Sequence, residues 1–341
     1  MRLLSVFRVV VLAVCASAAA VAGPGYHLVS KMMLGGNGGW DYVSYDSASG
    51  RLYVTHGSHV DVVDAATGAS VGAIVHTDGV HGVAIADAIG RGFTSNGRTA
   101  SVTVFDLKTL ATVGVVSGTG ADPDAIVYDP ATQRVFTFNA DSNSATAIDA
   151  KGGTVVGTVH LGASPGYAAV DGKGHAYVNL ERVDSVAEID TRALTVVRRW
   201  SVAPCHVPAA LAIDRVHRLL FSGCHNKVMA VSDIDRGAVV GTAAIGDGVD
   251  AVDFDPGTGT AFSANGDGTL TVVHEDSPGA FHVVENVVTQ PGVRTLAVDP
   301  RSHRVYMIGA QITPAGAPTA TDPNPRPTLV PNSFAILVYA P

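Results

Sequence analysis

Charge is scarce in this chain. Charged side chains make up 15% of its 341 residues, and 30 acidic against 22 basic residues give a formal net charge of −8. Long basic runs are absent as well. Bulk electrostatics therefore argue against a surface that wraps a phosphate backbone, and no nucleic-acid partner is expected.

Long hydrophobic runs are missing beyond the first residues. Arg2 and Arg8 flank an apolar start, residues 9–14 are wholly apolar, and alanine-rich sequence follows to Ala22. Small residues at Ala20 and Ala22 suit a signal peptidase, so we expect a signal peptide over residues 1–22 with cleavage before Gly23. A membrane anchor is the weaker alternative, because the run is short and Gly-Pro-Gly breaks it. The sequence thus predicts an exported protein, periplasmic or secreted, with no membrane span after cleavage.

Only three cysteines occur. Cleavage would remove Cys15 and leave Cys205 and Cys224, an even number in an oxidising compartment, for which a disulfide is favoured. Neither lies in a CxxC or a haem-attachment sequence. A zinc site that also uses His206 and His225 is the alternative, because both histidines directly follow a cysteine.

What the chain has instead is repetition. Apolar residues make up 47% and there are 38 glycines, as suits a large β protein with many tight turns. A short apolar stretch that ends in aspartate recurs seven times. The aspartates are Asp46, Asp87, Asp129, Asp171, Asp214, Asp255 and Asp299. Subtraction of successive numbers gives spacings of 41, 42, 42, 43, 41 and 44 residues, which is the period of a β-propeller blade.

Each unit predicts four short antiparallel strands, because its segments are brief and β-branched and show no helical periodicity. Third strands end in aspartates placed to hydrogen-bond the following turn: Asp64, Asp106, Asp149 and Asp190. We expect these recurring aspartates to be structural, since a catalytic carboxylate is needed only once.

The two ends of the chain complement each other. The last unit stops after its third strand, residues 333–339, whereas residues 27–35 read as a fourth strand without a unit. Pairing of the two termini in one blade would close the ring and remove an open edge. The sequence predicts an all-β fold, a single seven-bladed β-propeller domain of four-stranded antiparallel blades over residues 23–341.

The second strands carry a further signature. They read Tyr53-Val-Thr-His, Phe93-Thr-Ser-Asn, Phe136-Thr-Phe-Asn and Tyr177-Val-Asn, and Gly-x-x-Pro sequences precede several first strands. In these features the chain resembles the YVTN-repeat β-propeller family, and in particular its YncE-like exported proteins. The resemblance covers nearly all of residues 23–341. It implies the fold and export but no reaction, because the members share none that can be carried over.

Ligands of propellers bind where loops converge at the mouth of the central channel. The residue five before each first-strand aspartate should lie on that ring, at Asp41, Gly82, Asp124, Gly166, Ala209, Asp250 and Arg294. Purely structural repeats would carry one residue type there. Three aspartates and one arginine among small residues therefore predict a ligand site. Three carboxylates this close would repel one another unless a cation, Arg294 or altered pKa values relieve them.

The loops between second and third strands face the same mouth and carry the position at which the YVTN-repeat family has asparagine. His81 lies just outside the ring. The ligand-binding candidates are thus Asp41, His81, Asp124, Asp250, Arg294, Asn96, Asn139 and Asn265. Their oxygen atoms suit a hard cation such as Ca²⁺, and the nearby histidines favour Zn²⁺, so a metal on Asp41, Asp124 and Asp250 is one hypothesis. The alternative is that the asparagines cap turns and water fills the channel.

Two functions follow from this arrangement. The first is a binding module that presents a small-molecule or protein site at the channel mouth, where the proline-rich insertion 310–332 would lie as a cover or a plain strap. The second is a metal-dependent hydrolase of the lactonase kind, in which His81 or His206 moves protons. A quinoprotein-like oxidoreductase is disfavoured, since Trp40 and Trp200 are the only tryptophans.

Overall fold

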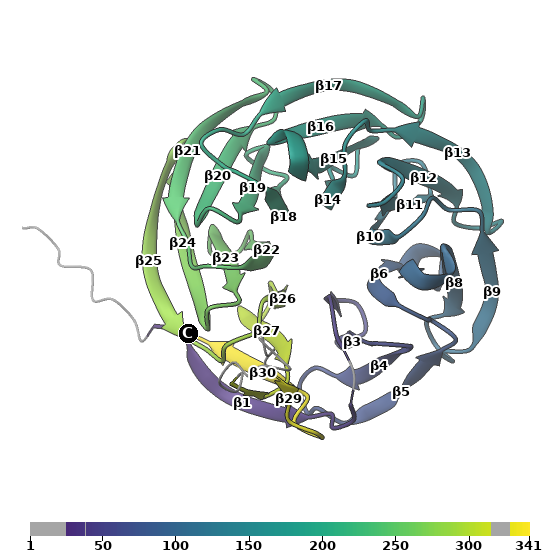
Figure 1. The fold of residues 1–341 in the computed structure, drawn as a ribbon, viewed down its shortest axis with the longest axis horizontal. Helices are drawn as coiled ribbons and strands as arrows, with labels where there is room; N and C mark the ends of the chain where they lie inside the picture. The colour runs from purple at the N-terminus through teal and green to yellow at the C-terminus, as the bar shows by residue number, and fades with distance from the viewer. Residues whose placement is uncertain (1–24, 38, 315–327) are drawn as a thin grey trace, which may run out of the picture.

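The computed structural model describes residues 25–37, 39–314 and 328–341. These residues form seven four-stranded antiparallel sheets arranged as blades around a central axis, together with a two-stranded ribbon (Figure 1). The predicted all-β, seven-bladed propeller is confirmed. The predicted signal peptide and residues 315–327 of the proline-rich insertion lie outside the described part of the chain.

Each blade is a four-stranded meander whose first strand is nearest the axis. The first strands are β2 (Val43–Asp46), β6 (Val80–Ala86), β10 (Pro123–Asp129), β14 (Pro165–Val170), β18 (Pro208–Asp214), β22 (Val249–Asp255) and β26 (Thr295–Asp299). The second strands are β3 (Arg51–His56), β7 (Arg91–Asn96), β11 (Arg134–Asn139), β15 (His175–Leu180), β19 (Leu219–Cys224), β23 (Thr260–Asn265) and β27 (Arg304–Gly309).

The third strands are β4 (His59–Asp64), β8 (Ser101–Asp106), β12 (Ser144–Asp149), β16 (Ser185–Asp190), β20 (Val228–Asp233), β24 (Thr269–Ser277) and β30 (Ala335–Ala340). The fourth strands are β5 (Ser70–Val75), β9 (Thr112–Ser117), β13 (Thr154–His160), β17 (Thr195–Ser201), β21 (Ala238–Ala244), β25 (Ala280–Val288) and β1 (His27–Met33). The described residues add the 3₁₀ turns η1 (Asp87–Ile89), η2 (Gly97–Thr99) and η3 (Glu181–Val183), and the ribbon of β28 (Ile312–Thr313) and β29 (Thr328–Leu329).

The two chain ends meet in the seventh blade. β1 pairs antiparallel with β30, from His27 opposite Ala340 to Met33 opposite Ala335. The sheet order is β1-β30-β27-β26, so the N-terminal strand supplies the outer strand of a blade otherwise built from the C-terminal residues. This closure, predicted from the sequence, sets blade seven beside blade one in the ring (Figure 1).

The core lies between neighbouring blades. Five of the six residues in a typical second strand are buried, as in β11, whereas the fourth strands alternate and bury few side chains. Phe136 and Phe138 of β11 pack with Val178 of the next blade in one apolar cluster. Blades are therefore held face to face by hydrophobic burial, which makes the ring a stiff support for its loops.

The recurring aspartates are structural, as predicted. Asp64 Oδ1 accepts hydrogen bonds from Ala66 N (3.1 Å) and Thr67 N (2.8 Å). The hydrogen bonds from Thr67 hold the pKa of Asp64 below its usual value. These turns lie on one face of the ring. The loops from fourth to first strands, and from second to third strands, lie on the other face, which holds the channel mouth.

Candidate functional site

Hydrogen bonds between blades position the side chains of the mouth. Tyr42 N donates to His81 O (3.1 Å), which joins the start of blade one to blade two. Thr295 Oγ1 donates to Asp41 O (2.7 Å) and so joins blade seven to blade one. Through these contacts the entry to the first strand of blade one is held by blades two and seven.

Asp41, His81 and Asp124 come together at the mouth, where the repeat alignment placed Asp41 and Asp124 on the ring and His81 just outside it. His81 Nδ1 lies 2.6 Å from Asp41 Oδ2 and 3.6 Å from Asp124 Oδ1, and His81 Nε2 lies 3.5 Å from Asp122 Oδ1. Asp124 Oδ1 is a buried atom without a hydrogen-bond partner among the described residues. One imidazole thus bridges two carboxylates from different blades and leaves an acceptor unused.

Electrostatics set the protonation of this group. Burial opposes a charged imidazole, but the hydrogen bond to Asp41 and the charges of Asp124 and Asp41 outweigh it and raise the pKa of His81 to about 9. Burial, followed by repulsion from Asp41, raises the pKa of Asp124 to about 7. At neutral pH His81 is therefore a cation, and Asp124 titrates in the physiological range.

The predicted Asp250 and Arg294 also lie at the mouth but form a separate pair. Arg294 Nε lies 2.8 Å from Asp250 Oδ2. Burial raises the pKa of Asp250, and Arg294 partly offsets that rise. The hypothesis placed a metal on Asp41, Asp124 and Asp250. The structure instead groups Asp41, His81 and Asp124, whose ligand atoms lie within 4.8 Å of one another.

An amphipathic pocket of ≈ 400 Å³ opens beside these groups. Trp40, Ile312 and Leu329 supply its apolar wall, and Asp41, Asp250 and Arg294 supply its polar lining. Ile312 and Leu329 are paired across the ribbon of β28 and β29, at the two ends of the proline-rich insertion. The described part of the insertion therefore borders the channel mouth.

Two tyrosines that the sequence analysis missed face the channel. The rings of Tyr42 and Tyr167 pack against each other at a tilt of 50°, with centroids 4.8 Å apart, and line a central cavity of ≈ 340 Å³. Burial raises the pKa of both hydroxyls, and the charges of Asp124 and Asp41 add to the effect. Both tyrosines stand four residues before their first-strand aspartates, so comparison of that repeat position would have found them.

The three predicted asparagines do not join the mouth. Asn139 Nδ2 donates to Ser144 Oγ (3.1 Å) and Thr146 Oγ1 (3.0 Å), while its Oδ1 accepts from Thr137 Oγ1 (3.0 Å). Asn96 and Asn265 make the matching contacts in their own blades, and all three are buried. Their place as ligand residues is corrected: their polar atoms are satisfied inside the blade and tie the second strand to the third.

Cys205 and Cys224 form a disulfide, with Cα atoms 5.6 Å apart. His206 turns away from it and places Nδ1 2.7 Å from Asp184 Oδ2. The two thiols bond each other, so the alternative zinc site with His206 and His225 is not formed. Cys224 also occupies the end of the second strand, where the other blades carry asparagine, histidine, leucine or glycine.

Another group of metal-ligand side chains lies on the opposite face. His217 Nδ1 approaches Asp214 Oδ2 (2.7 Å) and Glu275 Oε1 (3.0 Å). Burial raises the pKa of Glu275. Glu275 of blade six and Thr191 of blade four occupy equivalent positions, one residue after the position of the third-strand aspartate. Thr191 donates a hydrogen bond to Asp129. Asp214, His217 and Glu275 thus form an ion-pair contact between blades five and six.

Comparisons with known proteins bear on the fold alone. No protein-family model and no curated protein matches the chain. A chain from a solved structure titled "Crystal Structure of Mitotic Checkpoint Complex" aligns with a TM-score of 0.73 at 16% identity, over 95% of this chain and 99% of that one. A chain from "Structure of U3-55K" aligns with a TM-score of 0.73 at 9% identity, over 92% and 98%. The protein is thus a seven-bladed β-propeller repeat protein.

Among the described residues, no helix has the length and apolarity to traverse a bilayer.

Proposed function

We propose that this protein is an exported binding module of the YVTN-repeat type, whose channel mouth binds a small ligand that joins a positively charged group to an apolar one. The observation that carries the proposal is the unpartnered Oδ1 of Asp124. A buried carboxylate oxygen without a donor is unfavourable, and a cationic donor relieves it.

The charges at the mouth point to a cation. Arg294 neutralises Asp250, and protonated His81 neutralises only one of Asp41 and Asp124. Asp122 adds a further carboxylate 3.5 Å from His81. One negative charge or more is left over when Asp124 is ionised, so an ammonium group would complete the balance.

The pocket supports a ligand with an apolar part. Its ≈ 400 Å³ is within the usual range for small-molecule sites, and Trp40 offers a flat aromatic wall. Gly248, Gly266 and Gly292 form part of the lining and allow a ligand to approach the backbone. Asp41 belongs both to this lining and to the mouth group with His81 and Asp124, so an arylalkylamine has the chemistry to contact the pocket and the mouth group together.

Export is supported by the disulfide and by the expected signal peptide over residues 1–22. Cys205 and Cys224 are both fully buried, and disulfides of this kind persist in oxidising compartments. The intact mass of the protein recovered from the periplasm or medium tests this. It should equal a chain that starts at Gly23 and lacks free thiols.

The ligand proposal is tested with three probes of one shape. 2-Phenylethylamine, 2-phenylethanol and phenylacetate are cationic, neutral and anionic, and their binding is measured by calorimetry at pH 8, where Asp124 is ionised. The amine should bind most tightly. Asp124→Asn should weaken it about tenfold or more, which corresponds to loss of a charged hydrogen bond.

The matched control is Asp276→Asn, which removes an aspartate from the outer hairpin of blade six, whose nearest partner is His282. This variant should bind the amine as the parent does. Preference for phenylacetate, or unchanged amine affinity in Asp124→Asn, would refute the proposal.

The second candidate is a metal-dependent hydrolase, which the grouping of Asp41, His81 and Asp124 favours. A divalent ion such as Ca²⁺ or Zn²⁺ held there would polarise a carbonyl. His81 holds its proton up to about pH 9, so a metal would have to displace that proton and bind more weakly at pH 7. We therefore rank this function second. Lactone hydrolysis that is lost on chelation and in Asp124→Asn would reverse the order.

A further inference from the structure

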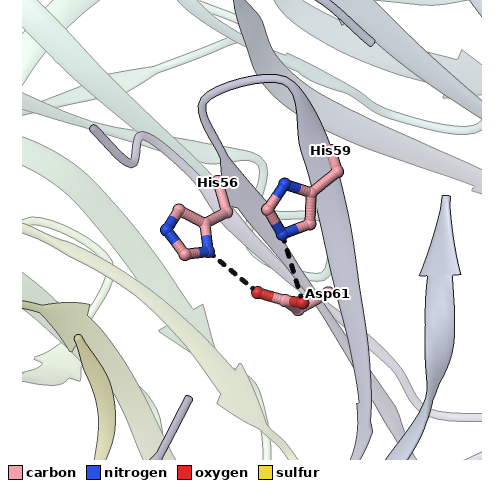
Figure 2. Close-up of side chains that lie close together, drawn as sticks. All are labelled: His56, His59 and Asp61. Atoms are coloured by element: carbon pink, nitrogen blue, oxygen red, sulfur yellow. Dashed lines mark hydrogen bonds and ion pairs between the residues drawn. The ribbon is translucent and has the colours of Figure 1, made fainter. Parts of the chain in front are cut away.

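We propose that the hairpin between the second and third strands of blade one binds one divalent transition-metal ion through His56, His59 and Asp61 (Figure 2). The three residues belong to β3 and β4 and lie outside the mouth group of Asp41, His81 and Asp124. This site is independent of the proposed ligand pocket.

The geometry suits a metal. His56 Nδ1 lies 3.0 Å from Asp61 Oδ2, and His59 Nε2 lies 3.4 Å from Asp61 Oδ1 (Figure 2). Ligands held tetrahedrally around zinc at about 2.05 Å are about 3.3 Å apart. Each nitrogen already lies at about that separation from an oxygen of the same carboxylate, and one ligand atom from each of the three residues lies within 4.8 Å of the others.

Comparison within the chain shows that this cluster replaces a structural one. The strand-end pair is Asn96 and Ser101 in blade two, and Asn139 and Ser144 in blade three. In blade one the same paired position holds His56 and His59. Two residues further along the third strand, Asp61 stands where the sister blades have Thr103, Thr146 and Thr271. A hydroxyl and amide cluster has thus become two imidazoles and a carboxylate.

Hydrogen bonding alone does not explain why blade one has two histidines and an aspartate in place of the asparagine and hydroxyl cluster. Asn139 makes three side-chain hydrogen bonds with hydroxyl groups inside its blade. His56 is 6% exposed, yet its Nδ1 has one partner and its Nε2 has none among the described residues. The unpartnered Nε2 lies on the side of the ring away from Asp61 (Figure 2), so it is Nδ1 that would bind the metal. An imidazole that leaves one nitrogen unpartnered is a poor structural substitute for asparagine, whereas an imidazole that presents Nδ1 to a carboxylate is an ordinary metal ligand.

Packing holds the first ligand in place. The His56 ring lies 4.6 Å from the ring of Phe334 and 4.7 Å from that of His59, measured between centroids. Gly36 closes the remaining side, because a Cβ there would come within 2.8 Å of His56 Cε1. A ring fixed on three sides presents Nδ1 to Asp61 with little loss of side-chain freedom on binding.

The site also has an opening. His59 lines a groove of ≈ 750 Å³ together with His76 and Asp78 at the junction of blades one and two. Water or a bound molecule in this groove would supply the remaining coordination positions. Two imidazoles with one carboxylate favour zinc, copper or iron over calcium, which prefers six or more oxygen ligands.

The experiment is a zinc titration by calorimetry on the EDTA-treated chain without a histidine tag, followed by Co²⁺ absorption spectroscopy. We expect one site whose Co²⁺ spectrum indicates four or five ligands. A variant that rebuilds the sister cluster with Val54→Thr, His56→Asn, His59→Ser and Asp61→Thr should lose about 100-fold or more in affinity. Its melting temperature should stay close to that of the parent, because the replacements repeat a cluster that blades two and three already contain.

Asp124→Asn is the control for the mouth, and it should leave the zinc affinity and the Co²⁺ spectrum unchanged. Zinc binding that survives in the rebuilt variant, or that disappears in Asp124→Asn, would place the metal elsewhere and overturn the inference. Failure of the parent to bind zinc, copper or iron would overturn it as well, without bearing on amine binding at the mouth.

Discussion

The residue at the end of the second strand decides what each blade can do. A second strand ends at this position in every blade, but the side chain is asparagine in three blades, Cys224 in the fifth and His56 in the first. The asparagines tie two strands together, the cysteine forms a disulfide and the histidine faces a carboxylate. One repeated position thus supports three kinds of side-chain interaction, and the blade folds with each of them.

The asparagine clusters should contribute measurably to stability. Asn139→Ala leaves the hydroxyls of Thr137, Ser144 and Thr146 without their shared partner in a buried place. We expect the free energy of unfolding to fall by about 2–3 kcal/mol in urea titrations. The control is Asn37→Ala at an exposed loop, which should change it by less than about 0.5 kcal/mol. Equal effects of the two substitutions would contradict the structural role.

The pKa of His81 predicts how stability depends on pH. A histidine whose pKa is raised on folding to about 9 stabilises the native state fully below about pH 6.5 and loses that contribution as pH rises to 9. The difference in unfolding free energy between the parent and His81→Asn should therefore shrink by about 1–2 kcal/mol across this window, after allowance for partial solvent screening. Urea titrations from pH 6 to 9.5 measure it. A difference that stays constant or grows with pH would show that the pairing with Asp41 is absent.

Among the elements, the loop that enters blade five is the one held covalently. The Cys205–Cys224 disulfide, with a sequence separation of 19, ties this loop to the end of β19. Elsewhere the corresponding loops are held by hydrogen bonds and packing. Variation between blades is thus concentrated in the loops of the mouth face, while the strands repeat.

Loss of this disulfide should destabilise the protein by about 3 kcal/mol, because a loop of this length gains considerable freedom in the unfolded chain. The paired substitution Cys205→Ala with Cys224→Ala should lower the urea midpoint to the value of the parent in dithiothreitol. The reductant should have no further effect on the variant. An unchanged midpoint in the parent under reducing conditions would refute the contribution.

At the scale of the whole molecule, stability depends on the meeting of the two ends. The outer strand β1 covers β30, so the ring has no interrupted blade (Figure 1). The structure places residues that are about 300 positions apart side by side, as with Met32 opposite Ile336. The entropy that is lost on closing this long loop is offset by a full strand of hydrogen bonds between β1 and β30.

Deletion of residues 25–33 should expose the edge of β30 and cause aggregation relative to the parent, since an uncovered strand pairs with other chains. Size-exclusion chromatography with light scattering measures this. Leu28→Lys alters an exposed side chain of β1 but keeps its main-chain hydrogen bonds, and it should elute as the parent does. A deletion variant that remains monodisperse and folded would show that the closure is dispensable.

The propeller and its closure were predictable because they depend on local patterns. The spacing of the first-strand aspartates and the unpaired strand at each end fixed seven blades, and the mouth ring followed from counting back five residues. Asp41, Asp124 and His81 do meet there. Tyr42 and Tyr167 were missed, because a tyrosine in a first strand looks like ordinary core until its partner across the channel is known.

The sequence by itself determined the period, the number of blades and the face on which the variable residues gather, because strand periodicity and turn chemistry act over a few residues. Only the tertiary structure decided which polar side chains are satisfied inside a blade, as Asn139 is, and which keep an unused atom, as Asp124 does. That distinction depends on distances between side chains from different strands and blades, and no local pattern encodes them.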